Sequence, residues 1–484
     1  MLLATGSGPH GSRRRGRPPE LGHNHQVTPK AHDRIPPGLA DIVGPSQVLT
    51  EPDMVAGYVA DFTGRYVGAT PAVVRPASTA EVAAVVSWCR QEGVALTLQG
   101  GNTGLVGGGV PLGGEVVLSL RRLDALEIDG TAGQATAGAG VTLAALQAGA
   151  VGAQWAYGVD FASRDSATVG GSVATNAGGL RVLRYGDTRA QVVGAEAVLG
   201  TGAVISHLSG LVKDNTGYNL ASLLCGSEGT LGVITAVRLR LVPPAPQRVV
   251  ALLAFDGLAP AIAAVGALRR EVGSLSAAEL FFAPGLELVC DVTGLRPPFS
   301  DRHAAYLLVE AAGQSDPAAD LSDAVGSLAA VADVAMGLDS VRSAELWRYR
   351  EAHTEAINTL GPPHKLDVTL PASALGAFLD AAPTTVTDVV ATARVWLFGH
   401  AGDGNIHVNV SGLEPDDERV DEAVLFLAAG LGGSISAEHG IGTAKRRWLH
   451  LNRSATEIET FASIKRALDP DGILNPNVLI PPPL

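Results

Sequence analysis

The chain of 484 residues contains few cysteines and few charged side chains, and both shortages exclude classes of protein. Its 3 cysteines (Cys89, Cys225 and Cys290) have no CxxC spacing, which argues against a disulfide framework or a zinc knuckle. Charged residues are 17% and hydrophobic residues 46% of the chain, a composition that excludes intrinsic disorder. The net charge is −13, so a nucleic-acid binder held by phosphate contacts is not expected. We expect a reduced, soluble, globular protein of about two to four domains.

Membrane-spanning and targeting signals are also missing. The longest apolar stretch, residues 249–268, is broken by Asp256, Gly257 and Pro260, so it predicts a strand, a turn and a helix. The first thirty residues are rich in arginine, but no apolar region follows the paired arginines and no amphipathic period is present. We therefore expect residues 1–33 to be a flexible tail, with no transmembrane segment and a cytoplasmic location.

Strands and helices alternate in the first half of the chain. A strand at 73–76 precedes a capping box of Ser78 and Glu81, which opens a helix that ends at Gly93. A buried strand at 94–98 then leads directly into a glycine-rich loop. Residues 130–242 hold short β runs, such as 192–199 and 231–241, and residues 243–246 read Pro-Pro-Ala-Pro, a linker.

Beyond the linker, the pattern predicts an open sheet with helices on one side. Strands are expected at 249–255, 304–310 and 364–370, helices at 259–270, 317–331 and 344–360, and a hairpin around Gly402. The remainder from about Ser434 reads as mostly helical. The predicted domains are therefore 34–244, 245–433 and a C-terminal segment at 434–484.

Two glycine clusters indicate a ligand with phosphate groups. The first glycine loop, residues 99–109, and the second glycine loop, residues 169–179, each carry several glycines in a row. Because no Cβ is present, consecutive backbone N–H groups can converge on a phosphate. Neither cluster is a Walker A loop or a Rossmann fingerprint. One cluster alone could be a surface loop, but two in one α/β region suit an extended diphosphate ligand.

A histidine hairpin predicts a metal site. Residues 394–400 and 406–410 read as two strands around a Gly-Asp-Gly turn, and closing the turn brings His400 and His407 to the same end. A single histidine is often structural, whereas two that converge favour a ligand pair. Glu438 can supply the third donor of a zinc-like set. Without further support, a carboxylate in the first turn of a helix is the alternative role for Glu438.

Arg350 and Thr354 are four residues apart in a predicted helix, so they lie one above the other. A guanidinium beside a hydroxyl is a good cradle for a carboxylate. The spacing is a weak signal, since the residues taken alone favour an ion pair of Arg350 with Glu351, Glu355 or another surface acid.

Three long motifs resemble one known family. They are residues 100–107, the run from Asp160 through Ser166 to 170–179, and residues 226–232, which read Gly-Ser-Glu-Gly-Thr-Leu-Gly. In order, they resemble the FAD-linked D-2-hydroxy acid dehydrogenases of the vanillyl-alcohol oxidase / p-cresol methylhydroxylase superfamily, over about residues 42–480. The resemblance implies an α+β fold. Its parts would be a two-part FAD-binding domain of the p-cresol methylhydroxylase type, an α+β cap domain with an open antiparallel sheet, and a C-terminal segment that returns to the flavin.

The resemblance also assigns residues to the cofactor, the metal and the substrate. The FAD contacts it implies are Gly100, Gly101, Asn102, Thr103, Gly104, Ser166, Gly170, Gly171, Asn176, Gly178, Gly179, Glu228, Asn405 and Asn475. The implied metal ligands are His400, His407 and Glu438, and the implied substrate residues are Arg350, Thr354, Lys365 and Asn409. Residues 99–111 contain no histidine or cysteine, so we expect non-covalent FAD, together with a divalent metal, preferably zinc.

The resulting hypothesis is oxidation of a D-2-hydroxy acid to the 2-oxo acid. His439 would take the hydroxyl proton, the hydride would pass to the flavin, and the metal would polarise the substrate oxygens. Residues 211–218 look closest to the D-2-hydroxyglutarate dehydrogenase branch, and Lys365 suggests a distal carboxylate unless it pairs with Asp367. D-lactate dehydrogenase and the FAD-linked component of glycolate oxidase are the near alternatives. A flavin-free binding protein and an alkyl-dihydroxyacetone-phosphate synthase type of transferase are the distant ones.

The expected partners are a small-molecule 2-hydroxy acid and an electron acceptor of unknown identity. A homodimer is left open, and no nucleic acid is expected.

Overall fold

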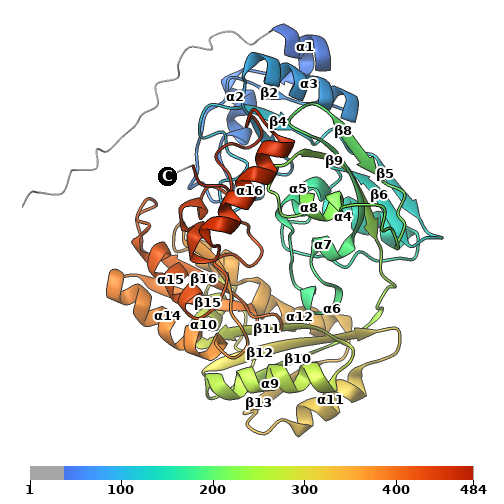
Figure 1. The fold of residues 1–484 in the computed structure, drawn as a ribbon. Coiled ribbons are helices and arrows are strands. Elements are labelled where there is room, and N and C mark those ends of the chain that lie inside the picture. Colours follow the sequence, from blue (N-terminus) through green and yellow to red (C-terminus); the bar gives the residue numbers. More distant parts are fainter. Residues whose placement is uncertain (1–36, 483–484) are drawn as a thin grey trace, which may run out of the picture. The chain divides into compact units, whose positions relative to one another are not determined.

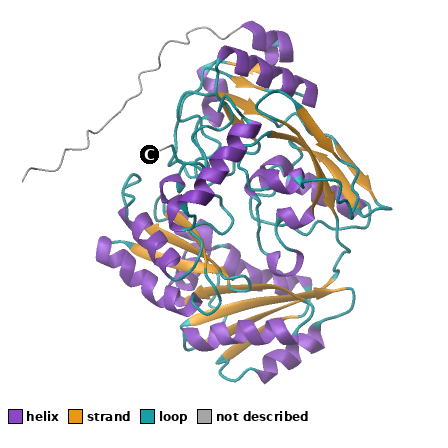
Figure 2. Ribbon diagram, viewed as in Figure 1, coloured by secondary structure: helices purple, strands orange, loops and turns teal. Residues whose placement is uncertain are grey.

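The computed structural model describes residues 37–482, so the predicted tail at 1–33 lies outside the described residues. Within the described part, the strands form three sheets, which helices cover (Figure 1 and Figure 2). The mixture of helices with parallel and antiparallel sheets confirms the predicted α+β class.

Two sheets belong to the half of the chain before the linker. The four-stranded sheet has the order β1 (Val48–Leu49), β2 (Val73–Val74), β4 (Val116–Ser119), β3 (Leu96–Gln99), with β3 and β2 parallel to β4. The five-stranded antiparallel sheet has the order β5 (Leu126–Asp129), β6 (Gln134–Gly138), β9 (Val233–Arg240), β7 (Val192–Val198), β8 (Val204–His207).

The helices of this half are short apart from two. They are α1 (Pro37–Val43), η1 (Pro45–Gln47), α2 (Pro52–Val55), η2 (Ala56–Tyr58), α3 (Thr79–Glu92), α4 (Leu143–Gly152), α5 (Val169–Thr175), α6 (Val182–Tyr185), α7 (Thr188–Gln191) and α8 (Leu220–Leu224). The signals read for α3 are confirmed: the Ser78 side chain accepts the Glu81 N–H, and Gly93 ends the helix with a left-handed φ of 66°.

The cap domain is built on a seven-stranded antiparallel sheet. Its order is β13 (Asp333–Gly337), β10 (Gln247–Phe255), β12 (Ala305–Gly313), β11 (Leu275–Phe282), β15 (Arg394–His400), β16 (Asn405–Ser411), β14 (His364–Thr369). Its helices are α9 (Leu258–Glu271), α10 (Ala283–Thr293), α11 (Ala318–Ser327), α12 (Ser340–Glu351), α13 (His353–Asn358), α14 (Leu375–Val389) and α15 (Arg419–Gly430).

Helices cover both faces of this sheet, so the prediction of helices on one side is wrong. Alternate residues of β10, such as Val249 and Leu253, pack with α9, α11, α14 and α15. The intervening ones, such as Leu252, pack with α10, α12 and α13. In Figure 1, α9 and α11 lie below β10 and β12, and α12 lies above them. Because both faces are buried, β10 reads as a continuous apolar run rather than an alternating one.

The predicted helix at 344–360 is in fact two helices, α12 and α13, separated at Ala352. The ring of His353 bonds to the carbonyl oxygen of Arg350 at 3.2 Å and packs between Phe281 and Phe398. The helix is interrupted at this point, although the local sequence is compatible with a continuous one.

The C-terminal segment is less helical than expected. It contains η3 (Arg446–Leu451) and α16 (Ala455–Leu468), but residues 434–443, here called the C-terminal loop, are irregular. Leu474 forms a parallel bridge with Leu96 of β3, and Lys465 of α16 donates to the Thr230 carbonyl at 3.0 Å. The end of the chain thus returns to the half that begins it, and its expected return to the flavin stays a prediction.

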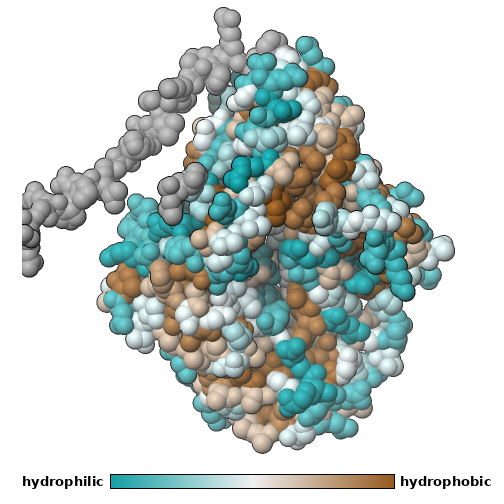
Figure 3. Space-filling view, in the orientation of Figure 1, coloured by the Kyte–Doolittle hydropathy of each residue, from teal (hydrophilic) through white to brown (hydrophobic). Residues whose placement is uncertain are grey.

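The described surface is mixed, with apolar side chains gathered beside α16 near α5 and α8 in the view of Figure 3. Leu220 and Leu223 of α8 are partly exposed, and Tyr218 just before them is 97% exposed. None of the described helices has the length and apolar character needed to cross a membrane.

Candidate active site

The hairpin of β15 and β16 places the two predicted histidines together. In its register, Phe398 pairs with His407 and His400 pairs with Asn405, so these side chains share one face of the sheet. The Nε2 atoms of His400 and His407 are 3.4 Å apart. The predicted convergence of the two imidazoles is therefore confirmed.

Glu438 approaches this pair from the C-terminal loop. Its Oε1 is 3.8 Å from Nε2 of His400 and 3.9 Å from Nε2 of His407. Two ligands of a tetrahedral zinc ion, each about 2.1 Å from the metal, lie roughly 3.4 Å apart, so the three separations fit one shared ion. Burial, helped by the charge of His400, lowers the pKa of His407 to about 3 and keeps it in the neutral form that binds metals. The alternative role for Glu438 in a helix is wrong, since its loop is irregular.

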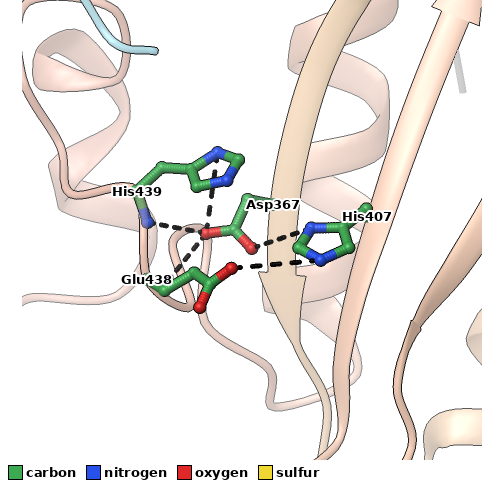
Figure 4. A group of neighbouring side chains, drawn as sticks. All are labelled: Asp367, His407, Glu438 and His439. Carbon is green, nitrogen blue, oxygen red and sulfur yellow. Dashed lines mark hydrogen bonds and ion pairs between the residues drawn. The ribbon is translucent and has the colours of Figure 1, made fainter. Parts of the chain in front are cut away.

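Asp367 of β14 lies between His407 and His439 and has no exposed surface (Figure 4). Its Oδ1 is 3.6 Å from Nδ1 of His407, and its Oδ2 is 4.0 Å from Nδ1 of His439. Oδ2 also accepts the backbone N–H groups of Ala437, Glu438 and His439 at 3.0, 2.8 and 3.0 Å. Burial alone would raise the pKa of Asp367, but His439 and the backbone amides hold it well below its usual range.

The four side chains drawn in Figure 4, Asp367, His407, Glu438 and His439, offer ligand atoms that all lie within 4.8 Å of one another. His407 and Glu438 belong both to this group and to the predicted set with His400. Nδ1 of His439 is buried and has no hydrogen-bond partner within the described residues. A buried nitrogen left unpaired is costly, so this atom indicates a site that accommodates a ligand or water.

Glu279 of β11 organises the other side of the cluster. Its carboxylate binds Nδ1 of His400 at 2.6 Å and Nε of Arg350 at 2.7 Å. Burial alone would raise the pKa of Glu279, but the charges of His400 and Arg350 lower it to about 2. A carboxylate at Nδ1 fixes the ring of a metal-binding histidine, so that Nε2 of His400 faces His407 and Glu438.

Glu228 holds the C-terminal loop from the other half of the chain. Its carboxylate accepts the N–H groups of Ile441 at 2.8 Å and Gly442 at 2.7 Å. A Cβ on Gly440 would lie 2.9 Å from the same carboxylate, so the loop approaches Glu228 closely. The loop that carries Glu438 and His439 is therefore tied to both halves of the molecule.

The glycines of the first glycine loop pack closely on residues 166–168, directly before the second glycine loop. A Cβ on Gly101 would lie 2.0 Å from the carbonyl oxygen of Ser166, and one on Gly100 would lie 2.2 Å from Oγ1 of Thr168. A Cβ on Gly104, by contrast, would meet no atom within 4 Å. Gly178 approaches Glu438, since a Cβ there would be 3.0 Å from Oε2. The two loops, here called the glycine cradle, thus leave Gly104 open and exposed and reach the histidine cluster at Gly178, an arrangement that a diphosphate site would require.

Comparison with known proteins agrees with this arrangement. Residues 70–207 match the model of an FAD binding domain, and residues 245–479 match that of the C-terminal domain of FAD linked oxidases. D-2-hydroxyglutarate dehydrogenase of Xanthomonas citri pv. viticola is 39% identical, over 91% of this chain and 96% of that protein. The mitochondrial D-2-hydroxyglutarate dehydrogenase of Bos taurus is 37% identical over 91% of this chain and 82% of that protein.

The chain belongs to the FAD-linked D-2-hydroxy acid dehydrogenase family.

Solved structures of more distant proteins show the same fold. Substrate-bound p-cresol methylhydroxylase superposes with a TM-score of 0.71 at 17% identity, covering 91% of this chain and 95% of its own. An alkyldihydroxyacetonephosphate synthase superposes equally well, with a TM-score of 0.71 at 17% identity over 92% of this chain and 85% of its own. At this identity the likeness concerns the fold alone. The predicted fold is confirmed, and family membership makes the chain an FAD-dependent oxidoreductase rather than a flavin-free protein or a transferase.

Several side chains that the family resemblance assigned to FAD are bonded to protein groups. Asn475 joins the Leu98 N–H to the Glu228 carbonyl at 2.8 and 2.7 Å. Asn405 donates to Asp367 at 2.7 Å. Asn176 donates to Asp187 at 2.7 Å, and Asn102 donates to the Ala60 carbonyl at 2.8 Å. These amides therefore hold other protein groups in place, and their direct contact with FAD stays a prediction.

The predicted substrate residues are distributed unevenly. Arg350 is buried, and its guanidinium stacks on Phe398, 4.6 Å from the ring centroid. Its Nε bonds to Glu279, and its terminal nitrogens form no hydrogen bond within the described residues. Thr354 is exposed beyond the break at Ala352, so the predicted cradle with Arg350 in one continuous helix is wrong. Lys365 pairs in register with Asn409, on the face that carries His407.

Two organising acids escaped the sequence-based site assignment. Glu279 is the only charged residue in the otherwise mostly apolar strand Leu275–Phe282, a position that could have signalled a buried ionic role. Asp367 was considered only as an ion-pair partner for Lys365, but it contacts the imidazoles, the C-terminal loop and the side-chain amide of Asn405.

Proposed function

We propose that this enzyme oxidises a dicarboxylic D-2-hydroxy acid, such as D-2-hydroxyglutarate or D-malate, to the 2-oxo acid. Family membership supports the reaction class, and relatives named for D-2-hydroxyglutarate cover most of the chain. FAD, held without a covalent bond, would supply the hydride acceptor. The glycine cradle with its open position at Gly104 supports this placement of the cofactor.

His400, His407 and Glu438 are the proposed ligands of a divalent metal, with zinc preferred. Their separations of 3.4 to 3.9 Å support a shared ion. When bound, the ion would act as a Lewis acid that lowers the pKa of the substrate hydroxyl.

His439 is the proposed general base. It accepts the hydroxyl proton at Nε2, while Nδ1 faces Asp367 across 4.0 Å. The Asp367 carboxylate stabilises the imidazolium that forms, and its hydrogen bond from the His439 N–H fixes the residue in place. The ring of His439 stacks on that of His407, with centroids 5.9 Å apart, so the base stands next to the metal ligands.

Lys365 carries the argument for a dicarboxylate. Within the described residues it forms no ion pair, although it is half-buried and burial lowers its pKa. A partly desolvated cation is costly unless an anion meets it, and a distal carboxylate would supply one. The terminal nitrogens of Arg350 would bind the other carboxylate, on the opposite side of the histidine pair. Asn409, the register partner of Lys365, would orient the substrate.

Steady-state kinetics of the Lys365→Met variant test this proposal. We expect the parent to favour D-2-hydroxyglutarate or D-malate over D-lactate in kcat/KM. In Lys365→Met, that preference should fall by at least about tenfold, since a hydrogen bond to a charged group contributes about 1.5–3 kcal/mol. Lys213→Met, which removes an exposed lysine, is the matched control and should leave the preference unchanged.

A parent that prefers D-lactate, or a variant that loses both activities equally, would contradict the dicarboxylate proposal. The first result would favour a D-lactate dehydrogenase, and a preference for glycolate would favour the glycolate oxidase alternative. A cytoplasmic location, a homodimer and the electron acceptor stay predictions.

A further inference from the structure

A tight turn at residues 59–68, here called the aromatic loop, presents Phe62 at its tip. Ala60 and Val67 form an antiparallel bridge that closes the loop. The Asp61 carboxylate accepts the Thr63 hydroxyl at 2.8 Å and the Tyr66 N–H at 3.3 Å. The loop is therefore held by its own bonds, although the Phe62 side chain is 62% exposed.

The base of the aromatic loop is attached to the first glycine loop. Asn102 donates to the Ala60 carbonyl at 2.8 Å, and Gln99 donates to the Tyr58 carbonyl at 3.0 Å. Tyr66 packs on Gly107, where a Cβ would come within 2.8 Å of its ring. The proposed phosphate cradle thus sets the position of the aromatic loop.

The far side of the aromatic loop is bonded to the cap domain. Arg65 donates to the Pro415 carbonyl at 2.9 Å and to the Asp421 carboxylate at 2.8 Å. Asp421 in turn binds the buried ring of His364 at 2.9 Å, directly before Lys365 in the chain. Arg65 and Lys365 are therefore placed relative to each other through two hydrogen bonds.

These attachments bring Phe62 to Lys365. The Lys365 ammonium lies 6.0 Å from the centroid of the Phe62 ring, at the outer limit of a cation–π contact. Phe62 comes from the FAD-binding half and Lys365 from strand β14 of the cap domain. An exposed apolar ring beside a cation that has no ion pair within the described chain shields one side of that cation from water.

We propose that Phe62 is a specificity-determining residue that closes the Lys365 end of the substrate site and limits the length of the acid. The inference rests on the proposed function, in which Lys365 receives the distal carboxylate. The ring would stand behind that carboxylate, so an acid with one more methylene would collide with it. Arg65 would act as a positioning residue that keeps the ring there.

The preference of the enzyme between two acids of different length tests this role. We would measure kcat/KM for D-2-hydroxyglutarate and for D-2-hydroxyadipate, which is one methylene longer, in the FAD-loaded enzyme. In Phe62→Ala, the kcat/KM for D-2-hydroxyglutarate divided by that for D-2-hydroxyadipate is expected to fall by at least about tenfold. One methylene group in a specific site usually changes kcat/KM by about this much. Phe62→Leu should lower this ratio less, and Arg65→Met should change it in the same direction.

Phe426→Ala is the matched control, because Phe426 is an exposed phenylalanine on helix α15 of the cap domain. It should leave the ratio at the parent value. FAD absorbance and thermal unfolding would verify that each variant is folded and loaded.

The possible failures are distinguishable. If the parent oxidises no dicarboxylic D-2-hydroxy acid, D-malate included, the proposed function fails and the inference fails with it. If the parent oxidises D-2-hydroxyglutarate but Phe62→Ala keeps the parent ratio, only the role of Phe62 is overturned. If the ratio changes in Phe62→Ala but not in Arg65→Met, the role of Phe62 is supported and the positioning role of Arg65 is overturned.

Discussion

The two sides of the active site are built from different parts of the polypeptide. On the cofactor side, the glycine loops offer backbone, and their glycines touch neighbours so closely that Gly101 has no room for a Cβ. On the cap side, side chains perform the chemistry, and each is held by a buried acid, as Glu279 holds His400 and Asp367 faces His407. On the cofactor side, a larger residue in place of a close-packed glycine such as Gly101 would clash with its neighbours. On the cap side, the imidazoles depend on the buried carboxylates that pair with them.

From this difference we expect that binding of FAD and binding of the metal can be lost separately. A substitution among the imidazoles leaves the glycine cradle intact, because hydrogen bonds from backbone N–H groups do not involve those rings. A substitution in the cradle leaves the sheet of the cap domain intact, because its cores are separate clusters of side chains.

Removal of a cap-side imidazole is expected to have the largest effect on activity. We predict that His407→Ala lowers kcat by more than about 100-fold, beyond the loss typical of a residue that merely supports a metal ligand. The variant should retain FAD, as measured by its absorbance, and should hold less metal by elemental analysis. His207→Ala, which removes an exposed histidine of β8, is the control. Activity near the parent level that does not respond to chelator would refute the metal role.

The cofactor side can be tested at its open position. Gly104→Ala places a methyl group where no protein atom lies within 4 Å, so the apoprotein should keep the parent melting temperature. We expect FAD to bind at least about tenfold more weakly, since loss of one hydrogen bond to a charged group costs about 1.5–3 kcal/mol. Titration of the apoprotein with FAD measures this. Gly101→Ala, which would clash with Ser166, should instead destabilise the protein itself. Unchanged FAD affinity in Gly104→Ala would place the phosphates elsewhere.

The smallest expected effect concerns pH and metal affinity. Burial alone would lower the pKa of His400, but Glu279 and Glu438 raise it to about 10, so the imidazole keeps a proton at neutral pH. A metal ion must displace that proton, and affinity should rise roughly tenfold per pH unit below the pKa. In Glu279→Gln, the lower pKa of His400 should flatten this dependence between pH 7 and 9. Competition with a chelator measures how steeply metal affinity rises with pH in the parent and in Glu279→Gln. Equal slopes in the two proteins would show that Glu279 does not control the protonation of His400.

Local patterns were sufficient to predict much of the cap side. Strand alternation around the Gly-Asp-Gly turn predicted that His400 and His407 converge, because a hairpin fixes its own register. Glycine spacing likewise located the two glycine loops, since the absence of a Cβ is visible in the sequence itself, and their binding of phosphate stays a prediction. The capping residues Ser78 and Gly93 set the limits of α3 for the same local reason.

Long-range pairing was beyond what these patterns contain. The partner of His400, Glu279, lies on a strand more than a hundred residues earlier, and only the sheet order makes them neighbours. The break at Ala352 was missed because residues 344–360 contain no proline or glycine that would mark it. Thr354 could therefore not be placed from the helical period alone.

The double attachment of the C-terminal loop also has a consequence for how the protein is made. Asp367 and Glu228 bind the loop through five backbone N–H groups, and Asn475 secures the segment that follows it to β3. During synthesis, the proposed base and the third metal ligand can reach their places only after residues 437–442 have left the ribosome, long after the glycine loops. A chain that ends before residue 437 would therefore lack both groups and would have no active form.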